Sequence, residues 1–311
     1  MVVSLSTLTL TESSISLYSM QMRNWNLHIL LLALCVLVSC SKQNADEEVI
    51  TVEYKACIYE YEMKSLGDGS QVNYIWYAVY NSDGSLFYQC GEPAVIEAGK
   101  AYCPVKMVLG KQYRVVFLAM HYDDQNIPAY DVDAAEALVR YSARVYANND
   151  KGDLFYTHED VAAYRGMVSK GVELERIGAQ INFLCNASDW NAAQQRPKTS
   201  ALELSGVPTA FSLIEGKVTG TSGNVSYQRT DLPEGGRMTV NGDYVVFSAY
   251  AFAPPAPQTT EAAAVLKMWN EGSAGNEDYA ISIPRMQLQS NVKTNVKGDL
   301  ISEGNKLLIN H

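Results

Sequence analysis

The sequence lacks an apolar run long enough to cross a membrane, and it has little histidine and no excess of positive charge. Its longest apolar stretch, residues 29–39, is 11 residues long, whereas a transmembrane helix needs about 20. Acidic residues outnumber basic ones by 34 to 24, and this balance argues against nucleic acid as a partner. Only three histidines follow residue 40, none lies in a known nucleophile motif, and G-x-S-x-G is absent. We therefore expect no enzymatic activity.

The short apolar stretch ends in Leu37-Val38-Ser39-Cys40, which resembles a bacterial lipobox. Its length suits the apolar region of a signal peptide, and Arg23 supplies the positive charge that precedes such a region. Residues 1–19 contain no Lys or Arg, so we expect translation to start at Met20 or Met22. The alternative interpretation of the stretch is a buried strand or a membrane-spanning helix.

A lipobox implies that residues 1–39 are removed as a signal peptide and that Cys40 is lipidated and anchors the chain to the outer membrane. Residues 40–49 would then be a tether. Its acidic residues 46–48 resemble the surface-export signals of Bacteroidetes lipoproteins, and a plain solvated linker is an equal alternative. We thus expect an outer-membrane lipoprotein at the cell surface.

Cysteines are few in the remainder of the chain and show no metal-binding spacing. Neither C-x-x-C nor a Cys/His pattern occurs, so no metal or cofactor is predicted. An exported protein can form disulfides, but we favour buried, unpaired thiols in strands. The four cysteines concerned are Cys57, Cys90, Cys103 and Cys185.

Aromatic composition and periodicity both predict an all-β fold. Twenty tyrosines accompany only seven phenylalanines and four tryptophans, which is typical of half-buried strands. Residues 50–58 alternate between apolar and polar side chains, as expected for a first strand. Turn residues at 81–85 and at Gly110 predict two β-hairpins. Residues 131–146 have apolar spacing closer to that of a helix.

The second half of the chain predicts another set of strands. Residues 172–184 are expected to form one long strand, and the polar residues 186–200 are the most linker-like stretch. Short apolar segments separated by turn residues follow up to residue 309. We therefore predict two domains, an N-terminal sandwich over residues 50–186 and a C-terminal sandwich over residues 187–311.

Four stretches of sequence are similar to the Bacteroidetes fimbrillins, the lipoprotein pilins of type V fimbriae. They are residues 113–122 (YRVVFLAMHY), 172–183 (VELERIGAQINF), 207–220 (VPTAFSLIEGKVTG) and 291–300 (NVKTNVKGDL). The resemblance implies two tandem transthyretin-like β-sandwich domains and assembly by donor-strand exchange. In that process a protease removes the first strand, and a strand from another subunit fills the vacated groove.

Under this resemblance residues 50–58 form the removable strand, and Lys64 is the candidate cleavage point. Many fimbrillins have Arg there, whereas residues 62–70 contain none. The donor would be residues 299–311, which can span about 43 Å at about 3.3 Å per residue. This length suits one strand and indicates a minor, tip or anchor subunit; the alternative is that the segment is the last strand of its own domain.

The sequence thus predicts a fimbrial subunit that mediates adhesion, with other pilin subunits, the outer membrane and a host or bacterial receptor as partners. The alternative is a surface glycan-binding lipoprotein of a nutrient-capture system, in which Trp269 could serve as an aromatic platform. Asn148, Asp150 and Asp153 weakly resemble a calcium loop, but no Glu closes it. Residues 158–160 (His-Glu-Asp) resemble an acid/base cluster, which we interpret as a solvated loop.

Overall fold

Strands make up nearly all of the regular structure in the computed structural model, which describes residues 47–58, 69–302 and 307–310. The described residues from Val49 onward belong to one compact unit. The elements are β1 (Val49–Ile58), β2 (Tyr74–Asn81), β3 (Leu86–Gln89), β4 (Ala94–Val95), β5 (Lys100–Val108), β6 (Gln112–Met120), β7 (Tyr130–Asp133), β8 (Leu138–Tyr141), η1 (Asp150–Gly152), β9 (Phe155–Ala162), β10 (Ser169–Arg176), β11 (Gly178–Cys185), α2 (Ala187–Ala192), β12 (Pro197–Ser212), β13 (Lys217–Asp231), η2 (Pro233–Gly235), β14 (Thr239–Val240), β15 (Asp243–Phe252), β16 (Thr260–Asn270), β17 (Tyr279–Leu288), β18 (Lys293–Gly298) and β19 (Leu307–Asn310).

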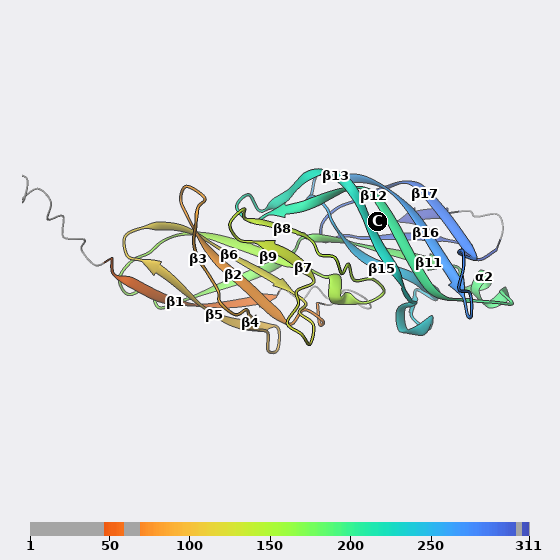
Figure 1. Cartoon of the computed structure of the whole chain (residues 1–311), viewed down its shortest axis with the longest axis horizontal. Coiled ribbons are helices and arrows are strands. Elements are labelled where there is room, and N and C mark those ends of the chain that lie inside the picture. The colour runs from red at the N-terminus through yellow and green to blue at the C-terminus, as the bar shows by residue number, and fades with distance from the viewer. Residues whose placement is uncertain (1–46, 59–68, 303–306, 311) are drawn as a thin grey trace, which may run out of the picture. The chain divides into compact units, whose positions relative to one another are not determined.

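The strands form three sheets (Figure 1). The first has the order β3-β2-β6-β9-β10-β1-β5, with β4 also paired to β2. The second has the order β14-β15-β11-β18-β19, and the third has the order β17-β16-β12-β8-β7, with β13 also paired to β12. The predicted all-β fold is confirmed.

The first sheet folds over itself at β10. Residues 169–174 of this strand pair with β1, whereas Glu175 and Arg176 pair with β9. Side chains of β1 and β6 meet between the resulting layers, where the rings of Tyr54 and Phe117 lie 5.1 Å apart. The second and third sheets also enclose a hydrophobic core between them. In this core the ring centroids of Phe247 of β15 and Tyr227 of β13 lie 5.8 Å apart. Both packings are those of β-sandwiches.

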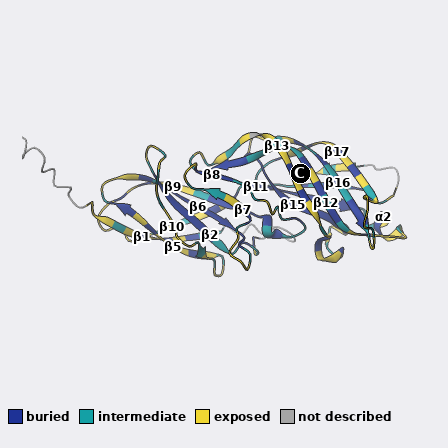
Figure 2. Cartoon of the chain, viewed as in Figure 1, coloured by how far each residue is buried: buried dark blue, intermediate teal, exposed yellow. Residues whose placement is uncertain are grey.

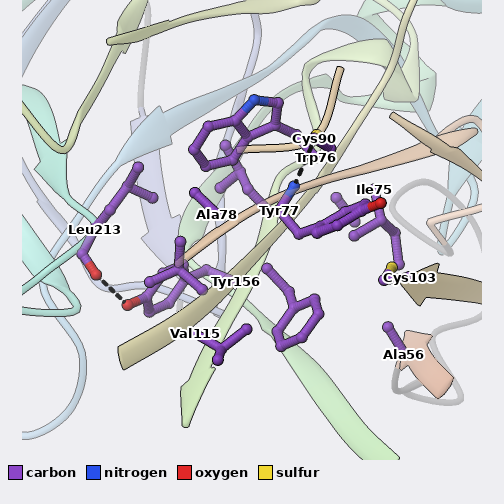
Figure 3. Close-up of a cluster of buried hydrophobic side chains, with 14 of the residues drawn as sticks. Ala56, Ile75, Trp76, Tyr77, Ala78, Cys90, Cys103, Val115, Tyr156 and Leu213 are labelled. Carbon is purple, nitrogen blue, oxygen red and sulfur yellow. Dashed lines mark hydrogen bonds between the residues drawn. The ribbon is translucent and has the colours of Figure 1, made fainter. Parts of the chain in front are cut away.

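The buried residues of the first sheet continue into the strands that follow residue 200. One hydrophobic cluster contains Tyr156 of β9 together with Phe211, Leu213 and Phe252. The Tyr156 hydroxyl donates to the Leu213 carbonyl at 2.6 Å, a bond drawn in Figure 3. The backbone N–H of Phe252 donates to the Tyr141 hydroxyl at 2.7 Å. Aromatic packing therefore joins strands that are far apart in the sequence.

Two sequence predictions about local structure are wrong in the first half of the chain. Residues 131–146 contain the hairpin β7–β8 and no helix, because Asp133 accepts the Glu136 N–H in a tight turn and β8 then pairs with β12. The turn at Gly110 joins β5 and β6, but β5 pairs with β1 while β6 pairs with β2 and β9. The hairpin predicted around residues 81–85 is confirmed by the pairing of β2 with β3.

The stretch predicted as one strand over residues 172–184 is two strands, β10 and β11, which lie in different sheets. The chain changes sheets at Ile177, whose N–H donates to the Leu154 carbonyl. Residues 186–200, predicted as a linker, contain α2 and the start of β12. The domain boundary near residue 186 remains a prediction; β11, which precedes it, pairs with β15 and β18.

Candidate functional site: the groove occupied by the first strand

Strand β1 is hydrogen-bonded to a neighbour along each of its edges. It pairs antiparallel with β5 from Val49–Val108 to Cys57–Lys100, and parallel with β10 from Glu53–Ser169 to Ile58–Leu174. The strand predicted over residues 50–58 is therefore confirmed. Removal of β1 would leave two rows of unpaired backbone N–H and C=O groups, one on β5 and one on β10.

The inner side of β1 fills a hydrophobic groove. Val52, Tyr54 and Ala56 are completely buried, whereas Thr51, Glu53 and Lys55 between them are exposed; burial along the strands is coloured in Figure 2. Tyr54 lies opposite Cys103 of β5 and Ala56 lies opposite Ala101; Ala56 and Cys103 are labelled in Figure 3. Burying a large apolar side chain stabilises a fold by about 1.5–3 kcal/mol. An empty groove would thus strongly favour any strand with the same alternation.

The groove also contains buried polar atoms. The Tyr54 hydroxyl and Oε2 of Glu159, from β9, are buried and have no hydrogen-bond partner within the described residues. Burial and the nearby Glu159 carboxylate raise the pKa of Tyr54 well above its usual value. The other oxygen of Glu159 pairs with Lys170 of β10. Sequence reasoning missed this group because the residues come from three separate strands.

Strand β19, which contains part of the predicted donor segment, is paired within its own chain. It runs antiparallel to β18 from Asn295–Asn310 to Gly298–Leu307. Leu307 and Ile309 are half-buried, and Leu308 is 58% exposed. Residues 299–311 can be interpreted either as a donor strand or as the last strand of the chain's own fold. The pairing of β19 with β18 agrees with the second interpretation.

The two residues singled out for modification, Cys40 and Lys64, lie outside the described residues. Lipidation of Cys40 and cleavage at Lys64 remain predictions. No helix in the described part of the chain has both the length and the apolar character that a membrane span requires.

The residues that resemble a calcium loop are engaged by protein groups. Oδ1 of Asn148 accepts the Ser248 N–H at 2.9 Å. The Asp150 carboxylate accepts the Tyr250 hydroxyl at 2.7 Å. Asp153 forms a buried ion pair with Arg176. Across residues 47–58, 69–302 and 307–310, no cluster of three or more His, Cys, Asp or Glu side chains could hold a metal ion.

Residues 158–160 lie in β9 and not in the solvated loop predicted from the sequence. Arg114 binds both oxygens of Asp160, at 2.7 and 2.6 Å, and holds the pKa of this carboxyl below its usual value. Glu159 points to the other side of the strand, toward Lys170. The three side chains therefore do not form an acid/base cluster.

Trp269, the candidate aromatic platform, is buried, and Arg229 lies over its ring. Its indole N–H donates to the Gly275 carbonyl at 3.2 Å, and the Arg229 guanidinium lies 4.6 Å from the ring centroid. A ring covered in this way has little face left to offer a sugar. All four described cysteines are free thiols; three are buried and Cys57 is half-buried.

The sheets and the occupied groove define an all-β sandwich protein whose first strand is bracketed by two others. The chain belongs to the family of unknown function DUF6562, which matches residues 42–310. A search of curated proteins finds no match.

Several solved structures are similar to the chain. A fimbrial assembly protein from Parabacteroides distasonis is 12% identical and gives a TM-score of 0.46. The alignment covers 85% of this chain and 97% of the other protein. The fimbrial anchor protein Mfa2 from Porphyromonas gingivalis is 11% identical, with 84% and 98% covered and a TM-score of 0.45. A Bacteroides thetaiotaomicron protein, described provisionally as polysaccharide binding, is 12% identical, with 84% and 95% covered and a TM-score of 0.48.

Proposed function

We propose that the chain is a fimbrial subunit, anchored at the outer membrane through Cys40, which accepts a strand from a neighbouring subunit in place of β1. The observation that carries this proposal is the position of β1 between β5 and β10, with three side chains in the core. Both backbone edges and the apolar groove would need a replacement strand once β1 leaves. The lipobox and the four fimbrillin-like stretches support the same function.

The accepting role fits the two ends of the described chain. Strand β1 is the first strand of the compact unit, so a single cut after residue 58 would separate it from β2. Strand β19 is already paired with β18, and a donating role would require its release. Adhesion to a receptor and the alternative function in glycan capture remain predictions.

Limited proteolysis of the lipid-free mature protein tests the proposal. Trypsin should make one N-terminal cut near Lys64, and the trimmed protein should then form ladders of oligomers that survive detergent at room temperature. Mass spectrometry identifies the cut, and gel electrophoresis identifies the ladder. Lys64→Gln should block both, whereas Lys151→Gln, a charge-matched control, should block neither. Diffuse degradation without ladders would contradict strand exchange.

A further inference from the structure

A pocket of about 390 Å³ lies where α2, η2 and the first residues of β12 and β15 come together. Its lining includes Trp190, Arg196, Lys198, Gly236, Arg237 and Tyr244. Small-molecule sites in proteins have volumes of about 300–1,000 Å³. The pocket is thus large enough for a small ligand, and it is separate from the groove of β1.

The aromatic part of the pocket is rigidly packed. The ring of Trp190 is 4% exposed and stacks on Tyr244, with centroids 4.8 Å apart and an interplanar angle of 18°. Gly236 has a φ of +80°, and a Cβ at this position would lie 3.3 Å from the Trp190 ring. Glycine therefore permits both the turn and the close contact with the indole. Tyr244 is only half-buried, so part of its surface remains accessible.

The two arginines of the pocket are held through their Nε atoms. Nε of Arg196 donates to the Trp190 carbonyl at 2.9 Å, and its guanidinium lies 5.7 Å from the Trp190 ring centroid. Nε of Arg237 donates to the Glu234 carbonyl at 3.1 Å. Both arginines are exposed, and each contact leaves unused the terminal nitrogens, which are the donors that bind carboxylate or sulfate in a bidentate manner.

The positive charges of the pocket have no carboxylate partner in the described part of the chain. Arg196, Lys198 and Arg237 form no ion pair there, and no acidic residue lines the pocket. By contrast, Lys297 of β18 pairs with Asp243 of β15 at 2.6 Å. Three uncompensated cations in a chain with a net charge of −10 create a local positive potential that attracts a small anion.

We infer that this pocket binds an acidic saccharide, with the carboxylate or sulfate of one sugar residue held by Arg196, Lys198 and Arg237. The exposed part of Tyr244 offers apolar surface to the C–H groups of the sugar ring. The anion-binding part follows from the pocket alone, whereas the choice of a sugar rests on the proposed location at the cell surface. Binding does not require exchange of β1.

Titration of the intact mature protein with trigalacturonate tests the inference, with neutral galactotriose and inorganic phosphate as comparison ligands. Calorimetry gives the affinity. Quenching of tryptophan emission gives a second signal, because one of the tryptophans of the mature chain, Trp190, lines the pocket. Trigalacturonate should bind at least about tenfold more tightly than either comparison ligand. Equal binding of the neutral sugar, equal binding of phosphate, or no binding of trigalacturonate would overturn the inference.

Variants locate the binding to the pocket. Lys198→Gln combined with Arg237→Gln removes two charges without touching Trp190 and should weaken trigalacturonate binding about tenfold or more. Arg140→Gln combined with Arg285→Gln removes the same charge from exposed ion pairs elsewhere and should leave the affinity unchanged. Equal weakening by both double variants would overturn the assignment. Oligomer ladders after trypsin, measured on the same variants, report separately on the proposed fimbrial function.

Discussion

Arg176 and Asp153 form a buried, bidentate ion pair. Nε and Nη2 of the arginine lie 2.8 Å from Oδ1 and Oδ2 of the aspartate, and the two side chains are 6% and 0% exposed. The guanidinium also lies 4.9 Å from the ring centroid of Phe155. Burial raises the pKa of Asp153, and the hydrogen bonds from Arg176 oppose that rise. The pair fixes the end of β10, where the chain passes from the first sheet to the second.

Loss of either partner of this pair should destabilise the fold. Arg176→Met leaves the Asp153 carboxylate buried without its counter-charge, so we expect unfolding free energy to fall by about 3–5 kcal/mol. Denaturant titration measures the change. Combining Arg176→Met with Asp153→Leu should recover much of the loss, because no charge is then left unpaired. A double variant as unstable as the single one would contradict this explanation.

The inward side chains of β1 should contribute most of the free energy with which this strand stabilises the fold. Tyr54→Ala removes a fully buried ring that packs against Phe117, and should cost about 3–5 kcal/mol. Thr51→Ala, on the exposed side of the same strand, should change stability by less than about 0.5 kcal/mol. Thermal melts compare the variants. Similar losses at both positions would show that β1 is not held through its inner face.

Thiol reactivity should differ among the cysteines. Burial raises the pKa of Cys103 and of Cys185 to about 12, so at pH 8 these thiols stay protonated and covered. Cys90 is also buried, whereas Cys57 on β1 is half-buried. Among these four cysteines, brief treatment of the native protein with a maleimide should label Cys57 first, as peptide mass spectrometry would show. Rapid labelling of Cys103 in native protein would contradict the position of β1 beside β5.

Asp189 should make the segment around Ile301 sensitive to acid. Its carboxylate accepts the backbone N–H groups of Ile301 and Ser302 at 2.9 and 3.1 Å. Burial acts to raise the pKa of Asp189, but these hydrogen bonds outweigh it and the pKa lies below its usual value of 3.8. A lowered pKa in the folded state contributes stability above pH 3.8, and the contribution is lost as the pH falls below that value.

Replacement of Asp189 tests this linkage at neutral pH. Asp189→Ala should destabilise the protein by about 1–3 kcal/mol, because the backbone N–H groups of Ile301 and Ser302 lose a charged, partly buried acceptor. Hydrogen exchange should accelerate at residues 301–302 more than in β1. The variant should also lose stability less steeply than the parent below pH 4. An unchanged acid profile would contradict the assigned role of the carboxylate.

Sequence periodicity predicted those elements whose burial alternates, and failed where pairing partners are distant. Residues 50–58 were predictable because one face is buried and the other exposed. A glycine turn such as Gly110 indicates a reversal but does not reveal whether its flanking strands pair. Ile177 was missed because the mixture of apolar and polar residues on either side of it resembles that of a single strand. The basic pocket was missed because Arg196 and Arg237 are far apart in sequence.

The packing of Phe252 against Tyr141, with ring centroids 4.6 Å apart, has a consequence for how the molecule melts. Phe252 of β15 belongs to the same cluster of buried residues as the interior of the first sheet. Unfolding of the first sheet would therefore expose apolar surface on the second sheet, and unfolding of the second sheet would expose apolar surface on the first. Calorimetry should therefore record a single endotherm. If the first sheet and the other two sheets were expressed as separate fragments, each fragment would expose apolar surface that is buried in the intact protein, and each should tend to aggregate.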